Sequence, residues 1–146
     1  MSQIIGLSMP KGYAGELTRG SFDHTTEVHP NNGTTPVAAF GIAVKLAADG
    51  SLAPCAAASD NVYGFSVRTF DQVDNAGVPM LKNLVTVLRR GYIAVTVASG
   101  TPAIGAQAYL TSAGAISAAS SNNTAITGAT FMGPAENGIA EIAFNI

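Results

Sequence analysis

The sequence predicts an all-β protein of about nine or ten short strands, arranged as an antiparallel β-sandwich, a jelly-roll-like fold or a small barrel. Runs of β-branched and aromatic residues alternate at period two, as half-buried strands do. Turn signals such as Asp49-Gly50 and Asn137-Gly138 separate these runs at roughly 8–12-residue spacing. No helical stripe of useful length is present. The spacing does not choose among these all-β topologies.

The chain begins with an apolar but aperiodic segment, residues 1–12, which we interpret as an extended arm or an edge strand. An arm of this kind can lie on a neighbouring molecule. Residues 13–20 place apolar side chains between glycines and predict a short strand with irregular ends. Residues 22–29 form the most polar predicted strand, and residues 30–36 form a loop rich in Pro, Asn and Gly.

Residues 37–47 predict the next strand. Asp49-Gly50 then predicts a hairpin turn into a short return strand over residues 51–54. Because proline cannot donate to a strand ladder, Pro54 should confine that end to the edge of a sheet.

The chain is organised around two predicted strands, residues 62–70 and 84–97. In the second of them Ile93 and Val95 begin one continuous apolar face, so a register slip would expose that face to water. Gly91 interrupts this strand after two arginines. A glycine inside a strand pattern predicts a bulge or a sharp bend.

The last part of the chain predicts four further short strands, over residues 107–111, 115–117, 125–131 and 139–146. Between the second and third of them, residues 118–123 contain only Ala, Ser and Asn and predict an exposed loop.

The composition indicates one domain, residues 1–146, with a thin core. Hydrophobic residues make up 47% of the chain, yet aromatic residues are only 7% and Trp is absent. Much of the apolar fraction is alanine, which buries little area, so we expect modest stability for an isolated subunit and added stability from assembly. Charged residues are 11%, against about 25% in an average protein. A surface so low in charge suits a protein that lies against other proteins; the alternative is a neutral Ser/Thr/Asn surface.

The charge pattern gives no indication of nucleic acid or an anionic membrane as a partner, because the net charge is −2 and there is no block of Lys or Arg. The first residues lack the pattern of a signal peptide. No apolar segment approaches the ~20 residues that span a bilayer as a helix. The single Cys55 cannot form an internal disulfide, so we expect synthesis in a reducing cytoplasm.

Two groups of residues are candidates for chemistry. Asp23, His24, Glu27 and His29 form the one metal-like cluster. On a strand, Asp23, Glu27 and His29 would share a face and His24 would point away, but two carboxylates and one imidazole are a weak zinc set, and the alternative is a solvated or interface-facing strand. Cys55 lies among small apolar residues with no adjacent base, which favours a structural thiol over a nucleophile. We expect no cofactor, and no nucleophile elbow or phosphate-binding loop indicates an enzyme.

The arginines stand out in a chain with few charges. Arg89 and Arg90 are consecutive, so on a strand they face opposite sides, and one could pair within the fold while the other reaches a partner. Arg68 is a third candidate for an interface, because arginine is enriched at interface hot spots. The alternative for these arginines is a solvated strand end with a local ion pair to Asp71 or Asp74.

The strand and turn spacing around the organising stretch carries a family resemblance. The strings that carry it are YGFSVRTFD and VLRRGYIAVTV, with VAAFGIAVKLAADGSLAP before them and GTPAIGAQAYLTSAGAIS after them. Over residues 36–117 the chain resembles the capsid decoration (cement) proteins of tailed bacteriophages. The resemblance implies a small β-rich protein, made in the host bacterial cytoplasm, that binds the outside of an assembled HK97-like shell and cements neighbouring copies of the major capsid protein. It also implies a homodimer or homotrimer.

The family motifs are scaffold, so they transfer no binding residue by name. We expect contact with the capsid through the N-terminal arm and the polar segment of residues 22–34, and self-association through an exposed strand edge. The candidate interface residues are Ile4, Ile5, Leu7, Tyr13, His24, Glu27, His29, Arg68, Arg89 and Arg90. The alternative function is a β-sandwich carbohydrate- or host-binding module of a phage particle; the absence of Trp argues against it, because such sites favour exposed aromatic platforms.

Overall fold

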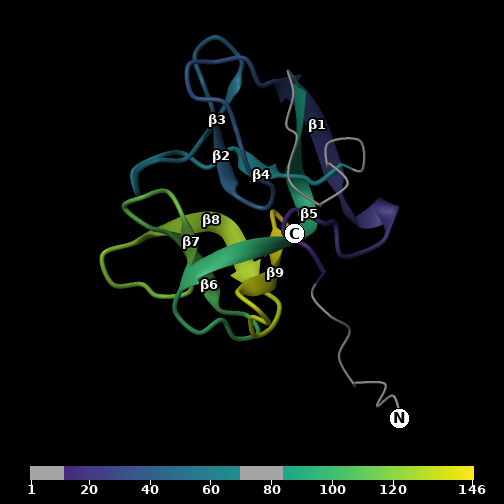
Figure 1. Ribbon diagram of the computed structural model, residues 1–146. Coiled ribbons are helices and arrows are strands. Elements are labelled where there is room, and N and C mark those ends of the chain that lie inside the picture. Colours follow the sequence, from purple (N-terminus) through teal and green to yellow (C-terminus); the bar gives the residue numbers. More distant parts are fainter. Residues whose placement is uncertain (1–11, 70–83) are drawn as a thin grey trace.

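A computed structural model describes residues 12–69 and 84–146, and within these ranges the protein is all-β (Figure 1). A 3-10 helix, η1 (Ser21–Asp23), precedes nine strands in the described part of the chain. The strands are β1 (Thr25–Pro30), β2 (Ala43–Leu46), β3 (Leu52–Pro54), β4 (Gly64–Ser66), β5 (Leu84–Ser99), β6 (Gln107–Leu110), β7 (Ile116–Ser117), β8 (Thr124–Phe131) and β9 (Ile139–Phe144). No helix within these ranges has the length and hydropathy to cross a bilayer.

The long strand β5 belongs to two parts of the fold (Figure 1). Its first half pairs antiparallel with β1 on one side and β4 on the other. Its second half pairs antiparallel with β9 and parallel with β7. The change falls between two neighbouring residues, because Arg90 is the partner of Thr25 in β1 and Gly91 is the partner of Phe144 in β9. One strand therefore joins an open sheet to a second group of strands.

That second group closes into a small barrel. The strands pair in the order β5-β7-β6-β8-β9, and β9 returns to β5. Closure pairs the strand edges with one another and so removes edges that would attract other chains. The predicted all-β fold is thus confirmed, and among the topologies that the spacing left open the protein forms a barrel.

The open sheet has the order β3-β2-β4-β5-β1. The hairpin predicted at Asp49-Gly50 is confirmed: it joins β2 to β3, and Gly50 has the positive φ of +83° that such a turn needs. The predicted edge position of Pro54 is also confirmed, because β3 pairs only with β2 among the described strands.

The core has two buried clusters. The larger one fills the barrel with fully buried side chains that include Ile93, Leu110 and Phe131. It also takes in Phe65 of the open sheet, which meets Phe144 of β9 edge-to-face with ring centroids 5.0 Å apart. The smaller cluster lies within the sheet and consists of Val37, Val44, Leu52, Val85 and Val87. Sheet and barrel therefore share buried side chains instead of meeting as separate bodies.

Several predicted strands are shorter in the structure. The strand expected over residues 37–47 begins only at Ala43. Polar side chains bind the preceding backbone instead: the Asn31 amide contacts the N–H and the carbonyl of Val37 at 2.7 and 3.0 Å, and Ser66 Oγ donates to Ala39 O at 2.9 Å. Such side-chain bonds compete with a strand ladder. Gly41, at φ +67°, bends the same segment.

Two other expected strands differ as well. The strand expected over residues 13–20 is reduced to one bridge, Leu17 with Ile93. The strand expected over residues 22–29 begins instead with η1 and becomes extended only at His24. The expected strand over residues 62–70 is β4 alone, with residue 70 outside the described ranges, as is the expected arm apart from Gly12.

Gly91 produces the bend that the sequence predicted. Its φ is +136°, which is left-handed and costly for any residue with a side chain. A Cβ at this position would lie 2.5 Å from the Cβ of His24 and 2.9 Å from the carbonyl oxygen of Asp23. The missing side chain thus allows the chain between η1 and β1 to pack directly on the bend of β5.

We predict that Gly91→Ala destabilises the protein by about 3–5 kcal/mol, because the substitution adds backbone strain and a steric clash. The matched control is Gly105→Ala, where φ is +78° but no atom lies within 4 Å of the added Cβ; strain alone should cost about 1–2 kcal/mol. Urea denaturation of both variants measures the difference. Equal losses would show that the close contact with residues 23 and 24 is unimportant.

Candidate functional site

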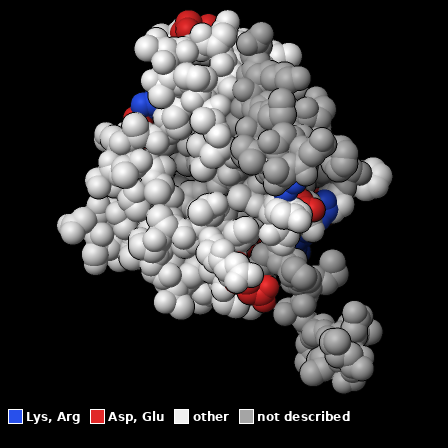
Figure 2. All heavy atoms as spheres, in the orientation of Figure 1, with Lys and Arg blue, Asp and Glu red and all other residues white. Residues whose placement is uncertain are grey.

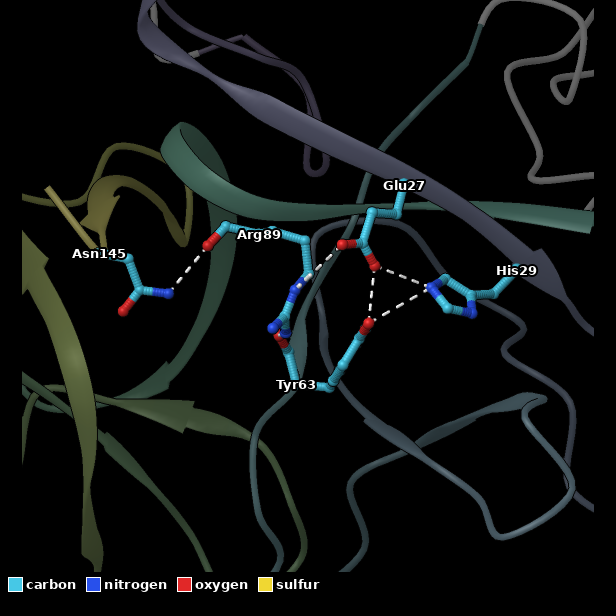
Figure 3. A network of polar contacts seen from close by, with 5 residues as sticks. All are labelled: Glu27, His29, Tyr63, Arg89 and Asn145. Carbon is cyan, nitrogen blue, oxygen red and sulfur yellow. Dashed lines mark hydrogen bonds and ion pairs between the residues drawn. The ribbon is translucent and has the colours of Figure 1, made fainter.

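A polar cluster lies where the open sheet meets the barrel, and it contains three of the predicted interface residues (Figure 3). Glu27 and His29 project from β1, and Arg89 projects from β5 just before the Gly91 bend. Tyr63, directly before β4, completes the set. We call Glu27, His29, Tyr63 and Arg89 the junction cluster. The predicted shared face of Glu27 and His29 is confirmed, because their side chains touch.

Glu27 is the centre of the junction cluster. Tyr63 Oη donates a hydrogen bond to Glu27 Oε2 at 2.6 Å, and His29 Nε2 lies 2.9 Å from the same oxygen. The other carboxylate oxygen, Oε1, lies 3.7 Å from Nε of Arg89. One carboxylate therefore joins β1 to the segment before β4 and to β5.

Arg89 fastens further segments to β5. Its guanidinium lies 3.6 Å from the centroid of the Tyr63 ring and also donates a hydrogen bond to the Tyr63 carbonyl oxygen. The backbone oxygen of Arg89 accepts a hydrogen bond of 2.8 Å from Nδ2 of Asn145, at the end of the barrel (Figure 3). Arg89 thus contacts the sheet through its side chain and the C-terminal segment through its backbone.

The hydrogen bonds also shift the acidity of the cluster. The bond with His29, and then the bond from Tyr63, lower the pKa of Glu27 below its ordinary value. Conversely, the bond to Glu27 raises the pKa of Tyr63. Glu27 is therefore an ionised acceptor with its partners in place. These contacts join β1, the segment before β4 and β5, so the geometry of the junction cluster is that of a connection between strands.

The possible metal ligands do not converge as the strand pattern suggested. Asp23 lies in η1 and not on the strand that carries Glu27 and His29, so the expected shared face of three ligands is wrong. Within residues 12–69 and 84–146, no group of three or more His, Cys, Asp or Glu side chains could hold a metal ion. Cys55 is 6% exposed, and burial raises the pKa of its thiol to about 12, which keeps it protonated and unreactive at neutral pH.

The other predicted residues lie on the surface or outside the described ranges. Tyr13 is exposed and has the guanidinium of Arg68 over its ring at 4.1 Å. His24 is half-buried beside Gly91, and Arg90 is exposed. The structure agrees with the predicted opposite orientation of Arg89 and Arg90, because Arg89 contacts Glu27 and Tyr63 in the junction cluster whereas Arg90 is exposed. Ile4, Ile5 and Leu7 lie outside the described residues.

Two residues that the sequence did not single out are prominent in the structure. Arg19 pairs with Glu141 at 2.8 Å and stacks on Tyr92 at 4.0 Å. No local signal could find a pair so far apart in the chain. Phe22 in η1 is 97% exposed, although it lies in a segment predicted to be a polar strand. Figure 2 shows a largely uncharged face on which charged atoms form a few separate groups.

Comparisons with known proteins give one family and one fold. The family model described as structural cement protein (E217 gp24/Pam3 gp6) matches residues 1–145. A chain in a structure titled "The capsid of Myoviridae Phage XM1" has a similar fold, with a TM-score of 0.74 over 99% of this chain and 97% of that chain. The two sequences are 19% identical, so the similarity concerns the fold alone. No curated protein matches the sequence.

We predict that Glu27→Gln flattens the loss of stability in acid. The pKa of Glu27 is lowered in the folded protein, so its contribution is present above the unfolded pKa and disappears as the pH falls through the folded value. The urea midpoint of the unsubstituted protein should exceed that of the variant at pH 7, and the two should converge towards pH 3. Glu136→Gln, a carboxylate outside the junction cluster, is the control. A constant difference across this pH range would contradict the role of the charge.

Proposed function

The chain belongs to the family of phage structural cement proteins, and from this premise we propose that it binds the outer surface of the assembled capsid and cements neighbouring major capsid protein subunits. The observation that carries the proposal is the family match over residues 1–145. The sparse charge supports it, because a surface that becomes buried against protein avoids the cost of removing charges from water.

The proposed mechanism is mechanical. A protein that binds the assembled shell, and not its separate subunits, shifts the equilibrium towards the shell by mass action. At a free concentration of 100 times Kd, each site adds about 2.7 kcal/mol to the stability of the assembled state. A homodimer or homotrimer would bind through several contacts at once and so raise the avidity. Among the described strands, β1 and β3 lie at the edges of the open sheet, and we propose such an edge for self-association.

The predicted interface residues divide into two groups in this proposal. Tyr13, His24, Arg68 and Arg90 lie at or near the surface and are proposed to contact the capsid, together with Ile4, Ile5 and Leu7. Glu27, His29 and Arg89 are occupied with one another, so their proposed role is to hold β1 in position for that contact.

We predict that the purified protein cosediments with mature, undecorated capsids of the phage that encodes it. Binding should saturate at a fixed ratio to the major capsid protein, and decorated shells should break up at a higher temperature than bare shells. The ratio would also identify the symmetry sites that are occupied. Folded, soluble protein that does not bind would contradict the proposal and redirect attention to a carbohydrate-binding module, which a glycan array would test.

A further inference from the structure

Phe22 is the most exposed large apolar side chain among the described residues, at 97%. It lies in η1, the dark purple segment that projects from the edge of the molecule between the open sheet and the barrel (Figure 1). Because the Phe22 ring lies outside the described core, packing does not explain why an aromatic residue stands at this position. Isolated exposed apolar residues are common, so the surroundings of Phe22 must decide whether it marks a contact.

The local structure holds this projection against β5. Asp23 N donates a hydrogen bond of 3.0 Å to Gly20 O, which closes the turn of η1. The backbone of Asp23 and His24 then packs on Gly91, the position at which a Cβ would clash. Phe22 therefore lies on a turn whose backbone packs against β5, the strand that sheet and barrel share. Because this backbone is already ordered, binding of the ring to a partner would cost little backbone conformational entropy.

An exposed arginine lies on the strand against which η1 packs. Arg90 precedes Gly91, is the cross-strand partner of Thr25, and is exposed. In the part of the chain that the structure describes, Arg90 has no ion pair and no aromatic ring beneath it. Arg19, by contrast, is already paired with Glu141 and stacked on Tyr92. The backbone thus places an exposed aromatic residue and an exposed arginine on adjacent segments, η1 and β5.

We propose that Phe22 and Arg90 form the anchor of the capsid contact, an inference that rests on the proposed function. The phenyl ring would enter an apolar pocket of a capsid subunit, and the guanidinium would pair with a carboxylate at the rim of that pocket. Aromatic and arginine side chains dominate binding energy at protein interfaces, where they fill desolvated pockets. The planar guanidinium is suited to a carboxylate because it can donate two parallel hydrogen bonds.

A hollow beside β8 is a poor match for this anchor on a second copy of the protein. This hollow of about 260 Å³ between the segment of residues 58–62 and β8 is lined by polar residues such as Ser59 and Thr124 and by apolar residues such as Val62 and Ile126. Its carboxylate, Asp60, already bonds Lys45 at 2.9 Å. The acid of this hollow is therefore occupied and does not complement the Arg90 guanidinium, and the family match favours a capsid subunit as the partner.

The test compares Phe22→Ala and Arg90→Ala with a matched control, Ile104→Ala, which removes another exposed apolar side chain. Binding to mature, undecorated capsids is measured by cosedimentation at several salt concentrations. We expect Phe22→Ala to raise Kd about 30-fold or more and Arg90→Ala to raise it about 5–10-fold, whereas Ile104→Ala changes it less than about 3-fold. The Arg90 variant should also lose part of the salt dependence of binding.

Urea midpoints should be nearly unchanged for Phe22→Ala, since 97% of the residue is already exposed in the folded protein. Normal capsid binding by Phe22→Ala would overturn the anchor while leaving the proposed function intact. A lower oligomer mass by light scattering, with unchanged affinity for the capsid, would assign Phe22 to self-association and would equally overturn it. If the unsubstituted protein itself fails to bind, the proposed function falls, and the anchor with it.

Discussion

The continuity of β5 through its bend at Gly91 is the constraint on which the rest of the structure depends. The first half of this strand lies between β1 and β4 of the open sheet, and the second half closes the barrel with β7 and β9. Only a residue without a side chain can take the required φ and accept the backbone of residues 23 and 24 against it. The relative position of sheet, barrel and η1 therefore follows from one residue in one strand.

Around that bend, the protein uses its few charges to fasten segments that are distant in sequence. Three of its four tyrosines have an arginine over the ring, in the pairs Arg19 with Tyr92, Arg68 with Tyr13, and Arg89 with Tyr63. Stacking on an aromatic face stabilises a guanidinium without burying it fully. Most charged side chains near the junction are thus occupied internally, and Arg90 is available for recognition.

The sequence predicted those features that depend on local chemistry. The Asp49-Gly50 hairpin and the bend at Gly91 follow from the φ that glycine allows, and the edge position of Pro54 follows from its missing N–H donor. Barrel closure was not predictable, because it depends on β7, which has two residues and pairs in parallel with β5. The junction cluster was predicted only in part: strand parity placed Glu27 beside His29, but Tyr63 and Arg89 come from other elements. The exposure of Phe22 could not be predicted from the strand pattern, because this residue lies in η1 and not at the start of the expected strand.

The closing pair of the barrel also has a consequence for the order of folding. Gly91 pairs with Phe144 and Thr96 with Ile139, so β5 finds this neighbour only when β9, the last of the described strands, is available. Such non-local pairings slow folding, since loop closure must precede the contacts that compensate for it. A ribosome-bound chain can form the β2–β3 hairpin early, whereas the barrel must wait until β9 has left the ribosome. Barrel closure is therefore a late step of folding, and a truncation within β9 would leave β5 and β8 with unpaired, aggregation-prone edges.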